Sequence, residues 1–87
     1  MFEWDEAKRL ATLGKHGLDF IDMVAVFDGP HYVRDARSDT ERREIAVGMV
    51  EGLFVAVVFT RRDDRVRLIT ARKARRDERR KYRFLFH

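Results

Sequence analysis

The side chains of this 87-residue chain that could do chemistry are a histidine, several arginines, a glutamate and a tyrosine. Cysteine is absent and the three histidines lack the spacing of metal ligands, so the sequence predicts no metal site and no cofactor. Histidine can exchange protons near neutral pH, and the planar arginine side chain binds phosphate bidentately. These properties favour acid–base chemistry beside a bound phosphate. The candidates are His16, Glu41, Arg43, Arg65, Arg67, Arg72, Lys73 and Tyr82.

Charge is divided sharply along the chain. Residues 1–60 contain seven Lys/Arg against eleven Asp/Glu, whereas residues 61–87 contain twelve against four. The overall net charge of +4 therefore conceals an acidic part and a strongly basic part. A basic end of this kind is typical of proteins that bind a polyanion or an acidic partner, although a solvated, charge-rich helix gives the same pattern.

The length suits a single domain, residues 1–87, built around one core. No stretch is apolar enough to span a membrane, and the N-terminus carries acids where a signal peptide needs bases. We therefore expect a cytoplasmic protein that makes no membrane contact.

Hydrophobic spacing and turn signals predict the elements that must position the candidate residues. We expect a first helix between a cap at Asp5 and Gly17, and a second helix from Asp19 to Phe27. The remaining expected elements are a short edge strand at 31–35, a loop at 37–41, strands at 43–50, 53–60 and 65–71, and a basic helix over 72–86. The predicted fold class is α+β, with two N-terminal helices and a C-terminal helix on a three- to four-stranded antiparallel sheet.

Turn chemistry predicts the strand register, and the register predicts which side chains share a face. A two-residue turn at 51–52 pairs Ile45 with Val58, and a two-residue turn at 62–63 pairs Val58 with Arg67. One face of the sheet, which the first two helices should cover, then carries Val55, Val57, Phe59, Val66 and Leu68. The opposite face combines apolar residues with arginines.

Three guanidinium groups, those of Arg43, Arg65 and Arg67, are expected to gather at one end of this opposite face. Like charges on neighbouring strands repel each other. Such a cluster indicates that an anion or an acidic partner binds there, through arginine forks that match phosphate. Alternatively, Glu41, Glu44 and the turn aspartates neutralise the cluster as surface ion pairs.

Several segments, taken together and in order, resemble the BrnT toxins over about residues 2–82. The matching segments are FEWDEAK at 2–8, KHG at 15–17 with Phe20, VFD at 26–28, Glu41-Arg42 with IAVG at 45–48, and RVRLITARKA at 65–74. The resemblance implies a RelE-like fold and a toxin that cleaves RNA without a metal ion, which inhibits translation and growth. The closing residues 83–87 are more aromatic than the family pattern.

The same resemblance implies partners. It predicts neutralisation by a BrnA-like antitoxin, which is a ribbon-helix-helix DNA-binding protein. Two toxins and two antitoxins would form a heterotetramer, and this complex would bind operator DNA through the antitoxin and repress its own operon.

Metal-independent RNA cleavage needs a base, an acid and cations that stabilise charge on the reacting phosphate. We expect Arg67, Arg43 and Arg65 to clamp the phosphate, with Arg72 and Lys73 beside them. The arginine cluster would serve equally well in a non-catalytic module that binds nucleic acid or the antitoxin.

The three candidate acid–base residues each have a structural alternative. His16 lies at a predicted helix C-terminus, where the helix dipole favours a cation, and it could simply bond free carbonyls there. Glu41 could act as a base or be a solvated loop residue. Tyr82 could donate a proton or stack on a base, or it could pack in the core.

Overall fold

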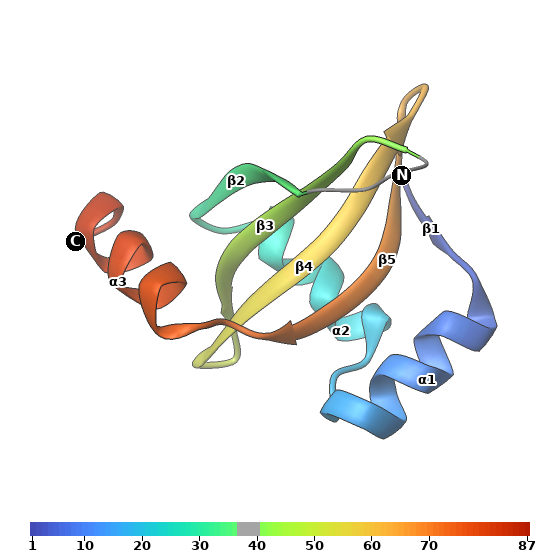
Figure 1. Cartoon of the computed structure of the whole chain (residues 1–87), viewed down its shortest axis with the longest axis horizontal. Helices are drawn as coiled ribbons and strands as arrows, with labels where there is room; N and C mark the ends of the chain where they lie inside the picture. The colour runs from blue at the N-terminus through green and yellow to red at the C-terminus, as the bar shows by residue number, and fades with distance from the viewer. Residues whose placement is uncertain (37–40) are drawn as a thin grey trace.

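The computed structural model describes residues 1–36 and 41–87, so most of the expected loop at 37–41 lies outside the described residues. Within these ranges the elements in order are β1 (Phe2–Trp4), α1 (Glu6–His16), α2 (Phe20–Met23), the 3-10 helix η1 (Val24–Phe27), β2 (His31–Ala36), β3 (Arg43–Val50), β4 (Leu53–Arg62), β5 (Arg65–Lys73) and α3 (Arg76–Leu85). They form an α+β fold around one sheet with strand order β1-β5-β4-β3-β2 (Figure 1). The predicted α+β class is confirmed.

The sheet differs from the prediction because it has five strands in the described residues and is mixed. Strands β2 to β5 are antiparallel, but β1 pairs parallel to β5, with Glu3 opposite Arg67. Strand β1 was not predicted, because its three residues are too few to show a strand pattern. Helix α1 begins only after Asp5, whose carboxylate accepts the amide of Ala7 at 2.8 Å. The residues ahead of the cap are therefore free to extend along the edge of β5.

The register of the β3–β4 hairpin is confirmed. Ile45 lies opposite Val58, and the turn residues Glu51 and Gly52 have φ angles of 51° and 80°. Positive φ at both central positions is the geometry of the type I′ turn, whose twist matches that of the flanking strands.

The predicted register of the β4–β5 hairpin is wrong. The turn is formed by residues 63–64 rather than 62–63, and Asp63 adopts a φ of 54°, which aspartate tolerates better than most residues. Further along, Ile69 is an extra residue between two aligned pairs, so Val58 lies opposite Thr70 and not Arg67. The turn shift and the bulge were both invisible in the alternation pattern.

The division of the sheet into two faces is confirmed. Strand residues of the predicted covered face pack with α2 and η1 in the main core, around Phe20, Val57, Phe59 and Leu68. The first helix does not cover this face as expected, because α1 lies beside β5, as Figure 1 shows, and contributes no residue to the main core. On the opposite face a smaller cluster forms under α3, around Tyr32. The rest of this face, toward the 63–64 turn, is called the open face below.

Two helices deviate from the predicted bounds. The expected second helix divides into α2 and η1. The expected C-terminal helix begins at Arg76 rather than Arg72, because Arg72 and Lys73 continue β5 and pair with β4.

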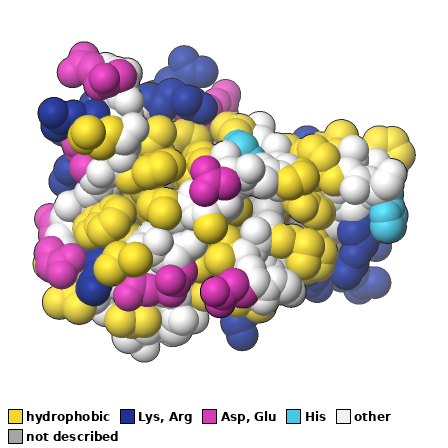
Figure 2. Space-filling view, turned by 180° about the vertical axis from the view of Figure 1, so that it is seen from behind, with side chains coloured by type: hydrophobic (Ala, Val, Ile, Leu, Met, Phe, Trp, Pro, Cys, Tyr) yellow, Lys and Arg dark blue, Asp and Glu magenta, His cyan; other side chains and the backbone are white. Residues whose placement is uncertain are grey.

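None of the described helices is long and apolar enough to cross a membrane. Seen from behind, the molecule shows apolar and acidic side chains, with Lys and Arg mainly at the margins (Figure 2).

Candidate functional site

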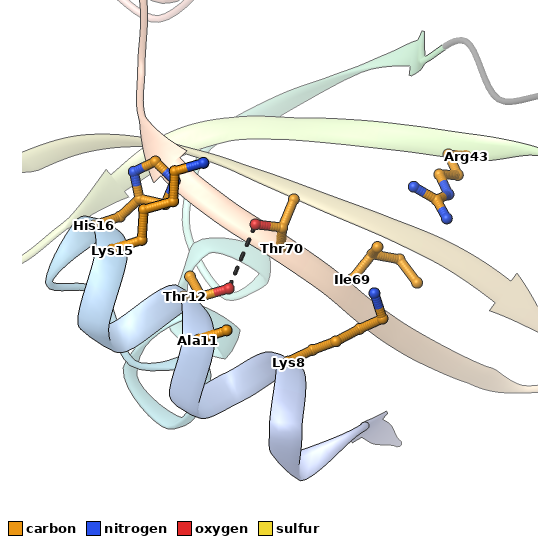
Figure 3. A pocket seen from close by; sticks show the side chains of 8 residues that line it. All are labelled: Lys8, Ala11, Thr12, Lys15, His16, Arg43, Ile69 and Thr70. Atoms are coloured by element: carbon orange, nitrogen blue, oxygen red, sulfur yellow. Dashed lines mark hydrogen bonds between the residues drawn. The ribbon is translucent and has the colours of Figure 1, made fainter.

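A hollow with a volume of about 290 Å³ lies between α1 and β5 (Figure 3). Four of the side chains that line it are basic or can become so, and no carboxylate lines it among the described residues. A concave surface with one sign of charge attracts counter-ions from solution. The lining residues are Lys8, Ala11, Thr12, Lys15, His16, Arg43, Ile69 and Thr70.

α1 supplies most of the lining from one of its faces. Lys8, Thr12 and Lys15 follow one another at helical spacing, and His16 is the last residue of the helix. The helix ends there because Gly17 takes a left-handed conformation, with a φ of 69°. Figure 3 shows His16 and Lys15 at one end of the hollow, with Lys8 reaching toward the other.

A β-bulge in β5 forms the opposite wall. The extra residue Ile69 breaks the alternation of β5, so that Ile69 and the next residue, Thr70, both line the hollow. The hydroxyl oxygens of Thr70 and Thr12 lie 3.4 Å apart, within hydrogen-bonding distance, and this contact ties α1 to the strand. The bulge therefore both shapes the hollow and fixes its width.

Arg43 reaches the hollow from β3 together with a carboxylate partner. Its Nε donates to Oε1 of Glu41 at 3.3 Å, and the other oxygen of Glu41 lies 3.7 Å from the guanidinium of Arg62. The structure thus brings three of the predicted residues, His16, Arg43 and Glu41, to the hollow or its border. Arg43 therefore both lines the hollow and contacts Glu41 through its Nε.

Arg65 and Arg67 share the open face but do not line the hollow. Both donate to Glu3 of β1, at 3.2 Å and 3.0 Å respectively. The hydrogen bond from Arg67, followed by that from Arg65, lowers the pKa of Glu3. Because β1 was not expected, the sequence analysis did not anticipate this neutralisation.

Arg72 is part of a buried cluster under α3. Its guanidinium donates to both oxygens of Glu78, at 2.8 Å and 3.0 Å, and Glu78 also accepts from Arg34 at 2.9 Å and from the amide of Arg75 at 2.7 Å. The Glu78 side chain is only 1% exposed. Burial by itself raises the pKa of Glu78, but the hydrogen bonds from Arg72, Arg75 and Arg34 outweigh it and lower the pKa to about 2. Arg72 therefore anchors α3 to the sheet.

Tyr82 and Lys73 also lie away from the hollow. Tyr82 is on the inner side of α3, where its ring packs edge-on against Phe54 and contacts Phe86, with centroid distances of 5.4 Å and 4.9 Å. Lys73 is exposed at the end of β5. The structure does not bring either residue to His16.

Other side chains at the site were missed by the sequence analysis. Lys8 and Lys15 could have been found, because they share a predicted helix face with His16. The position of Glu3 could not have been predicted, since it depends on β1. In residues 1–36 and 41–87, no three histidine or carboxylate side chains gather as metal ligands would.

Comparison with known proteins places these features in a family. A family model described as "Ribonuclease toxin, BrnT, of type II toxin-antitoxin system" matches residues 4–78, from β1 to the first turn of α3. No individual curated protein matches the chain. Because the match includes every residue that lines the hollow and most of the chain, this protein belongs to the BrnT family of ribonuclease toxins, which work in type II systems with a protein antitoxin.

Proposed function

We propose that the protein cleaves RNA without a metal ion, in the hollow between α1 and β5. The observation that carries this proposal is the convergence of Lys8, Lys15, His16 and Arg43 on one concave surface that no described carboxylate lines. A sugar–phosphate backbone is the polyanion that a ribonuclease of this family must bind.

The proposed reaction is an internal transesterification. The 2′-oxygen attacks the adjacent phosphorus and forms a new P–O bond, while the bond from phosphorus to the 5′-oxygen breaks. A base takes the proton of the 2′-hydroxyl, and an acid gives a proton to the departing 5′-oxygen. The products are a 2′,3′-cyclic phosphate and a 5′-hydroxyl, and no water is consumed. DNA is not a substrate because it lacks the 2′-hydroxyl.

Each basic side chain of the hollow then has a role, and so does Glu41 beside it. His16 exchanges the protons, since it is the lining side chain suited to both accepting and donating them near neutral pH. Arg43, with Lys8 and Lys15, binds the phosphate and stabilises the charge that develops on its oxygens. Glu41 acts as a positioning residue that holds the Nε edge of Arg43.

Arg65 and Arg67 lie on the same open face and bind the flanking backbone when a phosphate replaces Glu3. Arg72 and Tyr82 have a structural role, because their contacts fix α3. This proposal therefore gives Arg43, Arg65 and Arg67 a role in binding RNA and Arg72 a role in the fold.

We further infer that the antitoxin is a BrnA-like ribbon-helix-helix protein, that two toxins and two antitoxins form a heterotetramer, and that this complex represses its own operon. The family supports this inference in so far as its type II systems contain a protein antitoxin. Co-expression with the adjacent reading frame, followed by light scattering of the purified complex, measures the stoichiometry. A measured mass that differs from that of two toxins and two antitoxins contradicts the heterotetramer.

The proposed reaction is tested by incubating RNA with the purified protein in EDTA. We expect Arg43→Ala to reduce the rate about 10²–10³-fold and His16→Ala about 10²–10⁴-fold. Arg42→Ala is the matched control for Arg43→Ala, because Arg42 is adjacent in sequence, 81% exposed and outside the hollow. Cleavage by both hollow variants at the wild-type rate contradicts the site. Wild-type protein that binds RNA but leaves it intact would instead indicate a non-catalytic binding module.

A further inference from the structure

Ion pairing separates the basic side chains of this protein into two groups. Every arginine in strands β2 to β5 lies within 4.0 Å of a carboxylate. By contrast, no basic side chain of α3 forms an ion pair with any residue in the described parts of the chain. The same holds for Lys73, which is exposed three residues before α3 begins. The arginines of β2 to β5 are therefore neutralised within the fold, whereas the basic side chains of α3 keep an uncompensated charge, as Lys8 and Lys15 of the hollow do.

The outer side of α3 carries this charge next to an exposed aromatic ring. Arg76, Arg80 and Phe84 follow at i, i+4 and i+8, so they lie on one side of the helix. Glu78 and Tyr82 lie on the other side and contact the sheet. Arg76 and Arg80 are exposed, and Phe84 is 86% exposed. Phe84 therefore leaves most of its ring open to solvent, on the helix side that carries two guanidinium groups without an ion pair in the described residues.

This combination matches the chemistry of single-stranded RNA. Guanidinium groups bind backbone phosphates, and bases stack on aromatic side chains regardless of sequence. We propose that the outer face of α3, made of Arg76, Arg80 and Phe84, binds single-stranded RNA that extends out of the hollow. The inference rests on the proposed function, because it names where the substrate continues beyond the site of cleavage.

The two surfaces are close enough for one strand to reach both. Thr70 lines the hollow, and Lys73 and Arg76 follow it along the same chain. At about 3.3 Å per residue, the six residues from Thr70 to Arg76 span at most about 20 Å. In Figure 3 the chain passes from Ile69 to Thr70 toward the His16 end of the hollow. A strand that leaves the hollow at this end meets α3 within a few nucleotides.

The contact is additional to what the family model describes. The match ends at Glu78, so Arg80 and Phe84 lie beyond it. α3 is nevertheless held firmly, because the buried carboxylate of Glu78 accepts from Arg72 and Arg34. The structure thus presents this surface on a helix that is fixed relative to the hollow.

The first test measures binding of a fluorescent RNA oligonucleotide, 2′-O-methylated throughout so that it cannot be cleaved, by anisotropy between 0.1 and 1 M salt. The variant is Arg76→Gln/Arg80→Gln. Loss of two phosphate contacts lowers the slope of log K against log[salt] by about 1.4, which corresponds to about 25-fold weaker binding at 0.1 M and no difference near 1 M. The control is Arg42→Gln/Arg61→Gln, which removes the same charge from exposed, ion-paired positions on other elements.

The second test separates stacking from apolar docking at Phe84. We expect Phe84→Ala to weaken RNA binding about tenfold at every salt concentration, and Phe84→Leu to weaken it equally, because leucine has no ring on which a base can stack. Wild-type affinity in Phe84→Leu would indicate an apolar contact and overturn the proposal. Circular dichroism of each variant checks that the fold is intact, which we expect because these side chains lie outside both cores.

The outcomes keep this proposal distinct from the proposed function. We expect the α3 variants to cleave saturating RNA within twofold of the wild-type rate while their KM rises. If Arg76→Gln/Arg80→Gln binds RNA as tightly as the control variant does, the inference is overturned. It is also overturned if the variant binds RNA normally and loses affinity only for the antitoxin or for duplex operator DNA. If wild-type protein fails to cut RNA in EDTA, the proposed reaction fails, whereas the binding comparison on uncleavable RNA still decides the role of α3.

Discussion

Replacing Glu78 with glutamine should strongly destabilise the protein. The Glu78 carboxylate is 1% exposed and accepts hydrogen bonds from Arg72, Arg34 and the amide of Arg75. Glu78→Gln keeps the shape of the side chain but removes its charge, and it turns one acceptor into a donor that faces a guanidinium group. Two arginines then lose their counter-charge.

The magnitude follows from the pKa of Glu78, which falls from the usual value of 4.5 to about 2 in the folded protein. Each unit corresponds to 1.36 kcal/mol, so the charged form contributes about 3 kcal/mol to the free energy of unfolding at pH 7. Because the folded pKa is depressed, this contribution is complete above about pH 4.5 and is lost as the pH falls toward 2. For a domain of this size, about 3 kcal/mol corresponds to a Tm lower by roughly 15 °C.

Urea denaturation followed by circular dichroism, repeated from pH 7 down to pH 2.5, measures the effect. We expect residues 1–87 to unfold in one transition, with Glu78→Gln about 3 kcal/mol less stable at pH 7 and the difference shrinking as the solution is acidified. Asp77→Asn is the matched control, since Asp77 is the exposed neighbour on the same helix. A difference below about 1 kcal/mol at pH 7, or one that does not change with pH, would refute the reasoning.

Three further predictions concern other parts of the molecule. Glu3→Gln should tighten binding of uncleavable RNA severalfold at 0.1 M salt, because it releases Arg67 for phosphate; unchanged anisotropy curves would argue against this role. Tyr82→Phe should retain wild-type RNA cleavage and Tm, since the ring contact with Phe54 remains, whereas a loss of about 100-fold would restore a proton-transfer role to the phenol. Gly48→Ala should lower the free energy of unfolding in urea by about 1–3 kcal/mol, because the added Cβ would lie 2.8 Å from Cγ2 of Val26; equal stability would show that η1 can shift.

The parts of the fold that could be predicted are those fixed by local chemistry. The cap at Asp5 and the left-handed Gly17 set the ends of α1, and the turn at 51–52 sets the register of β3 against β4. Alternation in the strands then divided the sheet correctly into its two faces. These signals lie within a few residues of the feature that they determine.

The parts that could not be predicted depend on contacts between distant segments. β1 has three residues and exists because the edge of β5 is available to it. Arg72 and Lys73 have the composition of a helix, but pairing with β4 keeps them in a strand. Similarly, Arg72 has its structural role only because α3 brings Glu78 against it. The bulge at Ile69 that shapes the hollow leaves no pattern in the sequence.

The central claim, that the hollow between α1 and β5 directs attack by the RNA 2′-hydroxyl without a metal ion, is tested most directly by the ends of the RNA products. RNA cut by the wild-type protein in EDTA is analysed by mass spectrometry, with His16→Ala as the comparison. The account predicts 2′,3′-cyclic phosphate and 5′-hydroxyl ends, produced at least 100-fold more slowly by the variant. Products with 5′-phosphate and 3′-hydroxyl ends, or cleavage that stops in EDTA, would contradict it.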